Sequence, residues 1–228
     1  MKAPLFLVNQ MELEELKVKF GQKVNLLQAK QLASYMRNQF SFYGLHTPER
    51  RLIYHDFLLA EKKSKQINWQ LLNEAWQEPE REMQYFVCDY LIAMKKYFTF
   101  EEMARIESFV RTKQWWDTID SLIKPIGDLG LRDKRVDGLM LKWSVDPDIW
   151  VRRVAIEHQL LRKEKMNTDL LKKILKNNLN SQEFFINKAI GWALRDYSKT
   201  NPDWVRDFIA ENCDEMAKLS ITEGSKYL

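Results

Sequence analysis

The sequence predicts an all-α protein in which pairs of helices repeat along the chain as an α-solenoid. Three observations support this fold class. Glycine and proline are scarce, at 7 and 6 of 228 residues, so few positions interrupt a helix. No segment alternates cleanly between apolar and polar residues, as a half-buried strand would. Small residues also recur at a nearly fixed spacing, which is typical of stacked helical repeats. We therefore expect one HEAT-like repeat domain over residues 1–228.

The spacing of four small residues supports the repeat prediction. Cys88, Ser121, Ala155 and Ala189 follow one another at intervals of 33, 34 and 34 residues, each within an apolar helical segment. A small residue would let its helix approach a neighbour closely. The segment 148–155 is similar to the inner helix of a HEAT repeat. Coincidence in a helix-rich chain is the alternative, and four near-equal intervals argue against it.

In the first part of the chain, apolar residues three or four positions apart predict helices over residues 10–20 and 24–40. Thr47 suits the N-cap of the next helix, and Pro48 suits its first position. This helix is expected to continue over residues 48–62.

The remainder of the chain predicts a series of helices with short connections. They are expected at residues 80–97, 100–113, 116–126, 135–144, 148–163, 168–179, 182–199 and 202–217. Pro125 and Gly127 are expected to end the helix that begins at residue 116, because both disfavour a helix interior. A loop over residues 127–133 would follow.

The charge balance alone identifies no partner, because the formal net charge is only +4. Its distribution is less even. From Arg132 to Lys176 there are 12 Lys and Arg residues against 7 Asp and Glu residues, a local excess of +5 (12 − 7). Such an excess could bind an anionic partner. The alternative is a solvated helix surface, the usual meaning of a charge run.

The cysteines and histidines argue against a disulfide framework or a metal site. Cys88 and Cys213 lie far apart with no second pair, which suits a reducing compartment, and we expect a cytoplasmic protein. The three histidines do not cluster at ligand spacing, so neither a metal nor another cofactor is expected. No run of about 18 apolar residues predicts a membrane span. We interpret the start of the chain as an ordinary amino terminus and not as a signal peptide.

The segment 114–120, Gln-Trp-Trp-Asp-Thr-Ile-Asp, is the first candidate for chemistry. In a helix, Trp116 and Asp120 share a face, so an indole lies beside a carboxylate. A buried carboxylate needs a partner, so Asp120 requires a basic neighbour, a helix N-terminus or a solvated cleft. The alternative is that both tryptophans are core residues and Asp117 is a cap or a surface acid.

A solenoid would align equivalent positions of successive inner helices along one surface. Arg153 and Trp192 lie on the two helices after the one that carries Asp120. The three side chains could therefore meet in one groove. A guanidinium suits a phosphate, an indole suits a flat cation, and a carboxylate suits a developing positive charge. This set fits a cationic base on a DNA backbone. Trp150 is expected to be a core residue.

These segments resemble the AlkD-type DNA alkylation repair glycosylases, which are HEAT-like repeat proteins. The resemblance spans nearly the whole chain, and its most specific part is residues 184–202. It is carried by residues 35–38, 47–51, 115–117 with 120–121, 148–150 with 153–156, 188–192 with 194–195, and 197–202.

The resemblance implies a monofunctional DNA N-glycosylase of base excision repair, in a monomeric, nucleoid-associated protein that holds alkylated duplex DNA in a basic concave groove. It would hydrolyse the N-glycosidic bond of cationic lesions such as 3-methyladenine and 7-methylguanine. It would do so without drawing the base into a pocket, unlike most glycosylases. By position, Trp116, Asp120 and Trp192 match residues that contact the lesion-bearing deoxyribose, and Asp120 matches the catalytic carboxylate. Arg153 matches the arginine near the backbone.

Further residues are expected near the DNA. Tyr35, Thr47 and Arg51 match groups of the family there, whereas Lys142, Arg162 and Arg195 are general candidates for phosphate contacts.

A chemical mechanism follows from the charge of the lesion. An N-alkylated purine is already cationic and leaves as a neutral base, so no general acid is needed. Asp120 could then stabilise the oxocarbenium ion on the sugar and position water. Two alternatives are a non-catalytic helical protein that binds damaged or branched DNA, and a scaffold whose groove binds a peptide. DNA binding that weakens with salt would separate both DNA-binding hypotheses from the scaffold.

Overall fold

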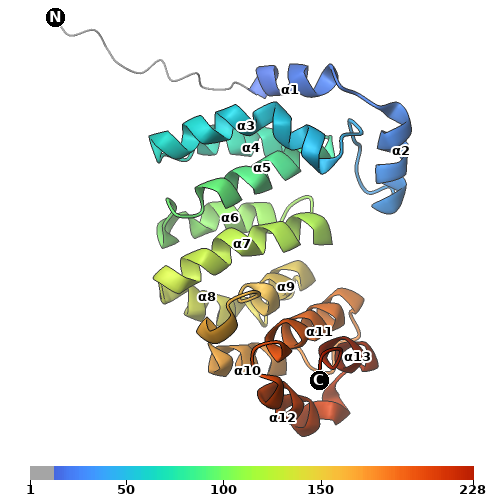
Figure 1. The fold of residues 1–228 in the computed structure, drawn as a ribbon, viewed down its shortest axis with the longest axis vertical. Coiled ribbons are helices and arrows are strands. Elements are labelled where there is room, and N and C mark those ends of the chain that lie inside the picture. The colour runs from blue at the N-terminus through green and yellow to red at the C-terminus, as the bar shows by residue number, and fades with distance from the viewer. Residues whose placement is uncertain (1–12) are drawn as a thin grey trace, which may run out of the picture. The chain divides into compact units, whose positions relative to one another are not determined.

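The computed structural model describes residues 13–228, and this part of the chain is helical throughout (Figure 1). It contains thirteen α-helices and no β-strand, with one isolated bridge between Ser41 and Glu80. The predicted all-α class is confirmed. The described residues fall into two compact units, one ending at Phe98 and the other spanning Thr99–Leu228. The single domain expected over residues 1–228 stays a prediction.

The first unit packs five helices around an aromatic core. They are α1 (Leu13–Gly21), α2 (Leu26–Tyr35), α3 (Thr47–Ser64), α4 (Trp69–Gln77) and α5 (Arg81–Met94). Both α3 and α4 pack against α5. Tyr54 and Phe57 of α3 contact Phe86 of α5, with ring centroids 5.1 and 6.1 Å apart. These large side chains supply much of the apolar area that the unit removes from water.

A buried carboxylate fixes the segment that leads into α3. Glu82 accepts hydrogen bonds from the backbone N–H groups of Tyr43, Gly44 and Leu45, at 3.1, 2.9 and 3.1 Å. Gly44 has φ +94°, and a Cβ there would lie 2.1 Å from the carbonyl oxygen of Asn25. Only glycine therefore fits this turn. The turn places the N-terminus of α3, which carries two of the predicted DNA-binding residues.

The second unit is a two-layer stack of helices. Its elements are η1 (Phe100–Glu102), α6 (Met103–Val110), α7 (Trp116–Arg132), α8 (Arg135–Trp143), α9 (Ile149–Glu157), η2 (Lys163–Lys165), α10 (Thr168–Lys176), α11 (Phe184–Ser198), α12 (Pro202–Asn212), η3 (Cys213–Glu215) and α13 (Lys218–Gly224). Successive packing joins α7 to α9, α9 to α11 and α11 to α13 (Figure 1). In the other layer, α8 packs against α10.

Polar side chains set the starts of several helices. The side chains of Asp148, Asn167 and Asn201 accept hydrogen bonds from the first turns of α9, α10 and α12. Each bond satisfies an N–H that has no partner inside its helix. Local sequence thus determines where these helices begin.

Contacts between successive repeats of the second unit recur at the predicted period. Arg153 reaches Asp120, 33 residues earlier, and the carbonyl of Phe185, 32 residues later. Gln114 bonds Asp148 across 34 residues, and Asn178 bonds the carbonyl of Ser144 across the same interval. Equivalent positions of neighbouring repeats are therefore in direct contact. This regularity confirms the helical repeat that the small residues indicated.

The predicted end of α7 is wrong. The helix continues through Pro125 and Gly127 to Arg132, so no loop occupies residues 127–133. Pro125 is buried in the helix interior together with Ile126 and Leu129, and burial of this apolar stripe outweighs the poor helix propensity of proline. Gly127 has a different role, because a Cβ there would lie 2.3 Å from the carbonyl oxygen of His158. It permits the close approach of α7 and the end of α9.

Several other predicted helices extend too far at their C-terminal ends. The segments 24–40, 100–113 and 148–163 contain Arg37, Lys113 and Leu161, which adopt φ values of 55°, 47° and 66°. A left-handed residue ends an α-helix, and here it is not the glycine that usually marks such an end. Residues 10–12 of the first predicted helix lie outside the described residues.

Other boundaries also differ. Helix α3 begins at Thr47, so His46 and not Thr47 is the N-cap, and Glu49 accepts from its backbone N–H at 3.0 Å. The helix α4, capped by Asn68, was not predicted. The segment predicted as one helix over 202–217 is α12 followed by η3, and α13 comes after it.

Helix α13 depends on two glycines. A Cβ at Gly191 of α11 would lie 2.6 Å from the Cβ of Glu223, and one at Gly224 would lie 3.0 Å from the Cβ of Leu194. Small residues at these positions let α11 and α13 pack closely. The C-terminal segment is therefore part of the stack.

Candidate active site

Asp120 and Arg153 form an ion pair at the centre of the second unit. Nε of Arg153 donates to Oδ1 of Asp120 at 2.9 Å, and Nη2 donates to Oδ2 at 3.0 Å. The Asp120 side chain is 21 % exposed, whereas the Arg153 side chain is 2 % exposed. This two-point geometry orients a carboxylate more strictly than a single bond does. The basic neighbour that Asp120 was expected to need is Arg153.

The predicted tryptophans lie around this pair. The guanidinium carbon of Arg153 is 5.4 Å from the Trp192 ring centroid, within cation–π range. Trp116 is the first residue of α7 and lies one turn before Asp120 on the same face. Both indoles are partly exposed. The structure thus brings together Asp120, Arg153 and Trp192, with Trp116 on the same helix face as the carboxylate.

The guanidinium is also held from α11. Nη1 of Arg153 donates to the backbone oxygen of Phe185 at 2.8 Å. The Phe185 ring packs against Trp150 and Trp115, with centroids 4.8 and 5.4 Å apart. Trp150 is buried, as expected of a core residue. This aromatic cluster holds the backbone of Phe185, which accepts the hydrogen bond from Arg153. The apolar core thereby helps to orient Arg153 and, through it, the carboxylate of Asp120.

A second carboxyl group, Glu157, lies beside Arg153 and was not predicted. Its Oε1 is 2.9 Å from Nη2 of Arg153, and its side chain is 0 % exposed. Burial is the main cause that raises the pKa of Glu157 well above 4.5, and Asp120 raises it further, while Arg153 opposes the shift. Its position four residues after Arg153 was a signal, because such residues share a helix face.

A lysine also lies near Trp192. Nζ of Lys188 is 5.9 Å from the Trp192 ring centroid and 2.6 Å from Oε1 of Glu223. The same Glu223 carboxylate accepts from Arg195 at 3.1 Å. The hydrogen bond from Lys188 is the main cause that lowers the pKa of Glu223. Arg195, expected at a phosphate, is thus half-buried in an ion pair between α11 and α13.

Arg162 was expected to contact a phosphate, and the structure corrects this prediction. Arg162 is 8 % exposed. It donates to the carbonyl of Gly127 at 2.8 Å and to the Gln159 side chain at 2.9 Å. These bonds tie the segment after α9 to the middle of α7. The residue is a buried structural arginine. Arg153 is likewise buried, and its guanidinium binds Asp120 and the Phe185 carbonyl. Its expected position near the DNA backbone stays a prediction.

The other predicted DNA contacts are on exposed surfaces. Tyr35 ends α2 and is 70 % exposed, and Thr47 and Arg51 lie on the exposed first turns of α3. Arg51 donates to Asp89 of α5 at 3.1 and 2.8 Å. Lys142 is exposed near the end of α8 in the second unit.

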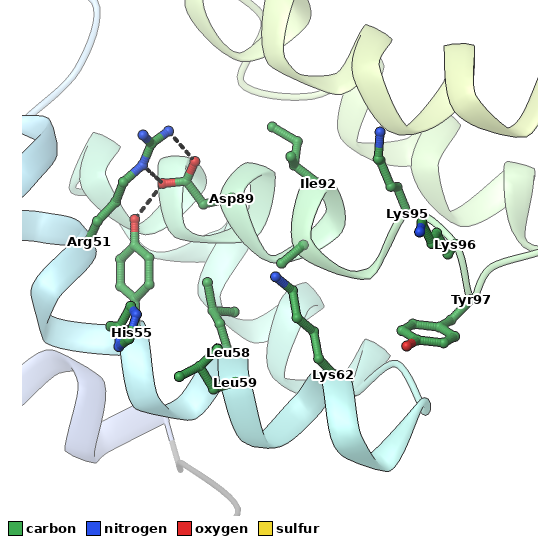
Figure 2. Close-up of a pocket in the computed structure, with 12 residues that line it drawn as sticks. Arg51, His55, Leu58, Leu59, Lys62, Asp89, Ile92, Lys95, Lys96 and Tyr97 are labelled. Atoms are coloured by element: carbon green, nitrogen blue, oxygen red, sulfur yellow. Dashed lines mark hydrogen bonds and ion pairs between the residues drawn. The ribbon is translucent and has the colours of Figure 1, made fainter.

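An open pocket of about 640 Å³ lies between α3 and the end of α5 in the first unit (Figure 2). At one end, Arg51 and Tyr54 donate hydrogen bonds to Asp89. Burial alone would raise the pKa of Asp89, but the hydrogen bonds from Arg51 and Tyr54 outweigh burial, so the pKa is lowered. At the other end, Figure 2 shows the lysine side chains. The residues that line the pocket are Arg51, Tyr54, His55, Leu58, Leu59, Lys62, Asp89, Ile92, Ala93, Lys95, Lys96 and Tyr97. The apolar floor and cationic rim suit an anion attached to an apolar group.

Fold and site together define an all-helical repeat protein with an oriented carboxylate between indoles. The chain belongs to the DNA alkylation repair enzyme family, whose model matches residues 16–228. A structure described as a predicted DNA alkylation repair enzyme from Enterococcus faecalis is 35 % identical, covers 90 % of this chain and 97 % of its own, and superposes with a TM-score of 0.84. The predicted family is confirmed.

Two structures from Streptococcus mutans share the fold at lower identity. AlkD2 is 19 % identical, with a TM-score of 0.63 over 88 % of this chain and 99 % of its own. The protein smu.31 of strain UA159 is 18 % identical, with a TM-score of 0.57 over 78 % of this chain and 97 % of its own. No curated protein matches the chain. Within residues 13–228, no helix is both long and apolar enough to cross a membrane.

Proposed function

We propose that this chain is a monofunctional DNA N-glycosylase that excises cationic N-alkylated purines from duplex DNA. The observation that carries the proposal is the partly exposed Asp120, held at two points by buried Arg153 beside Trp192. Membership of the DNA alkylation repair family supports a substrate on DNA. The proposed lesions are 3-methyladenine and 7-methylguanine, and hydrolysis proceeds without drawing the base into a pocket.

The mechanism follows from the movement of charge. The alkylated base carries a positive charge and leaves as a neutral molecule, so the bond breaks without protonation of the leaving group. The charge passes to the deoxyribose as an oxocarbenium ion. Asp120 faces that cation as an anion whose direction is fixed before the reaction, which is the arrangement that stabilises a transition state most effectively. It also positions the water molecule that attacks the sugar.

The surrounding residues keep Asp120 ready for this role. Arg153 holds the carboxylate in one orientation and is itself held by the Phe185 carbonyl. Trp116 and Trp192 present indole faces to the cationic sugar and base, an interaction that strengthens when water is excluded. A water-accessible edge of Asp120 remains for the substrate, since its side chain is 21 % exposed.

Contacts with the phosphate backbone are proposed for exposed cations of both units. In the first unit, Arg51, Lys62 and Lys96 line the pocket between α3 and α5. In the second unit, Lys142 is exposed. Each neutralised phosphate releases counterions and so makes DNA binding weaker at higher salt.

The test is release of free base from methylated duplex DNA by the pure protein, with a chelator present and no nucleotide added. We expect 7-methylguanine or 3-methyladenine above the spontaneous background, measured by chromatography of the supernatant. Duplex binding without release of either base would instead support the non-catalytic DNA-binding alternative.

A further inference from the structure

Glu157 is a fully buried carboxyl group directly behind the candidate active site. It lies on α9, one turn after Arg153, and its Oε1 is 2.9 Å from Nη2. Neither of its oxygens accepts a hydrogen bond of good geometry from a protein group. The guanidinium is directed elsewhere, with Nε and Nη2 donating to Asp120 and Nη1 donating to Phe185. One cation therefore has two carboxyl neighbours and is aligned with only one of them.

The charged groups around Glu157 do not balance a second anion. Asp120 faces it from α7 and repels a negative charge, while Arg153 is the cation that pairs with it among residues 13–228. On α11, Lys188 is paired with Glu223 of α13. Directly after α9, the C-cap residue His158 is buried and neutral, because burial and then Arg162 lower its pKa to about 3.

The helices α8 and α10 also pack on α9. The nearby acidic group on these helices, Asp137, interacts with Arg162 and not with Glu157. Asp137 of α8 bonds Asn167 at 3.3 Å and favours the charged form of Arg162. An ionised Glu157 would thus be a buried anion without its own partner, which is strongly unfavourable.

We propose that Glu157 is a positioning residue that holds Asp120 through a hydrogen bond donated by a neutral carboxyl group. This inference rests on the proposed glycosylase function. The protonated oxygen donates to Asp120, which then accepts from Arg153 and from Glu157. The direction of the pKa shift agrees with this arrangement, because burial and the negative charge of Asp120 both raise the pKa of Glu157. Glu157 does not touch the substrate, because its side chain is 0 % exposed.

The first arm of the test measures protonation without DNA. The pKa of Glu157 is higher in the folded protein than its ordinary value of 4.5. The neutral carboxyl group therefore contributes its full stabilisation below pH 4.5, and this stabilisation is lost as the pH rises toward the folded pKa. Glu157→Gln removes this proton linkage and leaves other groups in place. Its folding equilibrium constant relative to wild type is expected to rise as the pH increases above 4.5, by up to about tenfold per pH unit, until the folded pKa of Glu157 is passed. Urea unfolding at each pH measures the ratio of the two folding equilibrium constants. A ratio that stays constant with pH would show that Glu157 is not held neutral in the folded protein.

The second arm measures the role in the reaction by single-turnover base release. The amide of Glu157→Gln can still donate to Asp120, so a loss below about threefold is expected. Glu157→Leu fills the space without a donor and is expected to lose about 10–100-fold, as when a group that orients a catalytic ligand is removed. Melting temperatures confirm that both variants are folded.

The outcomes are distinguishable. A Gln variant as slow as the Leu variant would show that the charge of Glu157 is needed, and a Leu variant as fast as wild type would show that Glu157 only fills space. Either result overturns the positioning role. If wild type releases no base, the proposed function fails, and the stability arm still decides whether Glu157 is protonated.

Discussion

At the scale of residues, one buried cation, Arg153, is shared by two carboxyl groups. Arg153 is buried, so the loss of all carboxylate partners would leave an isolated charge in the protein interior. Asp120 is the aligned partner and Glu157 is the second. Their different exposure gives them different tasks, because only Asp120 can reach a substrate.

This sharing predicts a non-additive effect on stability. Asp120→Asn alone is expected to be only mildly destabilising, because Glu157 can lose its proton and pair with Arg153. The double variant Asp120→Asn/Glu157→Gln removes both carboxylates and is expected to lose about 3–5 kcal/mol. Urea unfolding of wild type, both single variants and the double variant measures the coupling. Additive losses would show that the two groups do not share the arginine.

Most of this site could be predicted from the sequence, and part of it could not. Asp120, Arg153 and Trp192 could be predicted to meet because residues one repeat apart align in a solenoid. The burial of Arg153 could not, since it depends on the packing of Phe185 against Trp150. The position of Glu157 on the same helix face was visible, but its neutral state depends on burial that only the fold reveals.

At the scale of elements, close helix contacts decide what the local sequence leaves open. Pro125 disfavours a helix interior, yet α7 passes through it because the proline is buried together with Ile123 and Ile126. Gly127 disfavours a helix as well, and its lack of a side chain admits the carbonyl of His158. Propensity predicted a break where tertiary packing requires continuity.

Gly127→Ala tests this role. Alanine favours the helix by up to about 1 kcal/mol, but its Cβ would lie 2.3 Å from a backbone oxygen, which cannot move as a side chain would. Overpacking of this kind costs about 1–3 kcal/mol, so we expect a lower melting temperature. Gly138→Ala on α8 is the matched control, because nothing lies within 4 Å of its added Cβ. It is expected to raise the melting temperature. A gain for both variants would refute the close approach.

At the scale of the whole molecule, the small net charge of +4 conceals local concentrations of cations. The pocket between α3 and α5 has lysines at its rim, while its acid, Asp89, is occupied by Arg51 and Tyr54. The rim therefore carries net positive charge toward solvent. Such a site suits the DNA backbone without selecting a base sequence.

Substitution of the rim lysines tests this contact. Lys62→Gln/Lys96→Gln is expected to weaken binding to undamaged duplex and to reduce the slope of log affinity against log salt by about 0.9 for each lost phosphate contact. The exposed pair Lys218→Gln/Lys226→Gln removes the same charge elsewhere. Fluorescence anisotropy at several salt concentrations measures both slopes. Equal slopes for the two double variants would assign the effect to net charge alone.

Single-turnover base release by Asp120→Asn tests most directly whether Asp120 stabilises the oxocarbenium ion. Loss of one well-placed electrostatic group predicts a rate about 10²–10³ lower, with duplex affinity retained, because Arg153 keeps Glu157 as a partner. Asp117→Asn, three residues earlier on α7, is the control and should retain its rate. Equal losses in the two variants, or an Asp120→Asn loss that only follows the fraction of unfolded protein, would contradict the account.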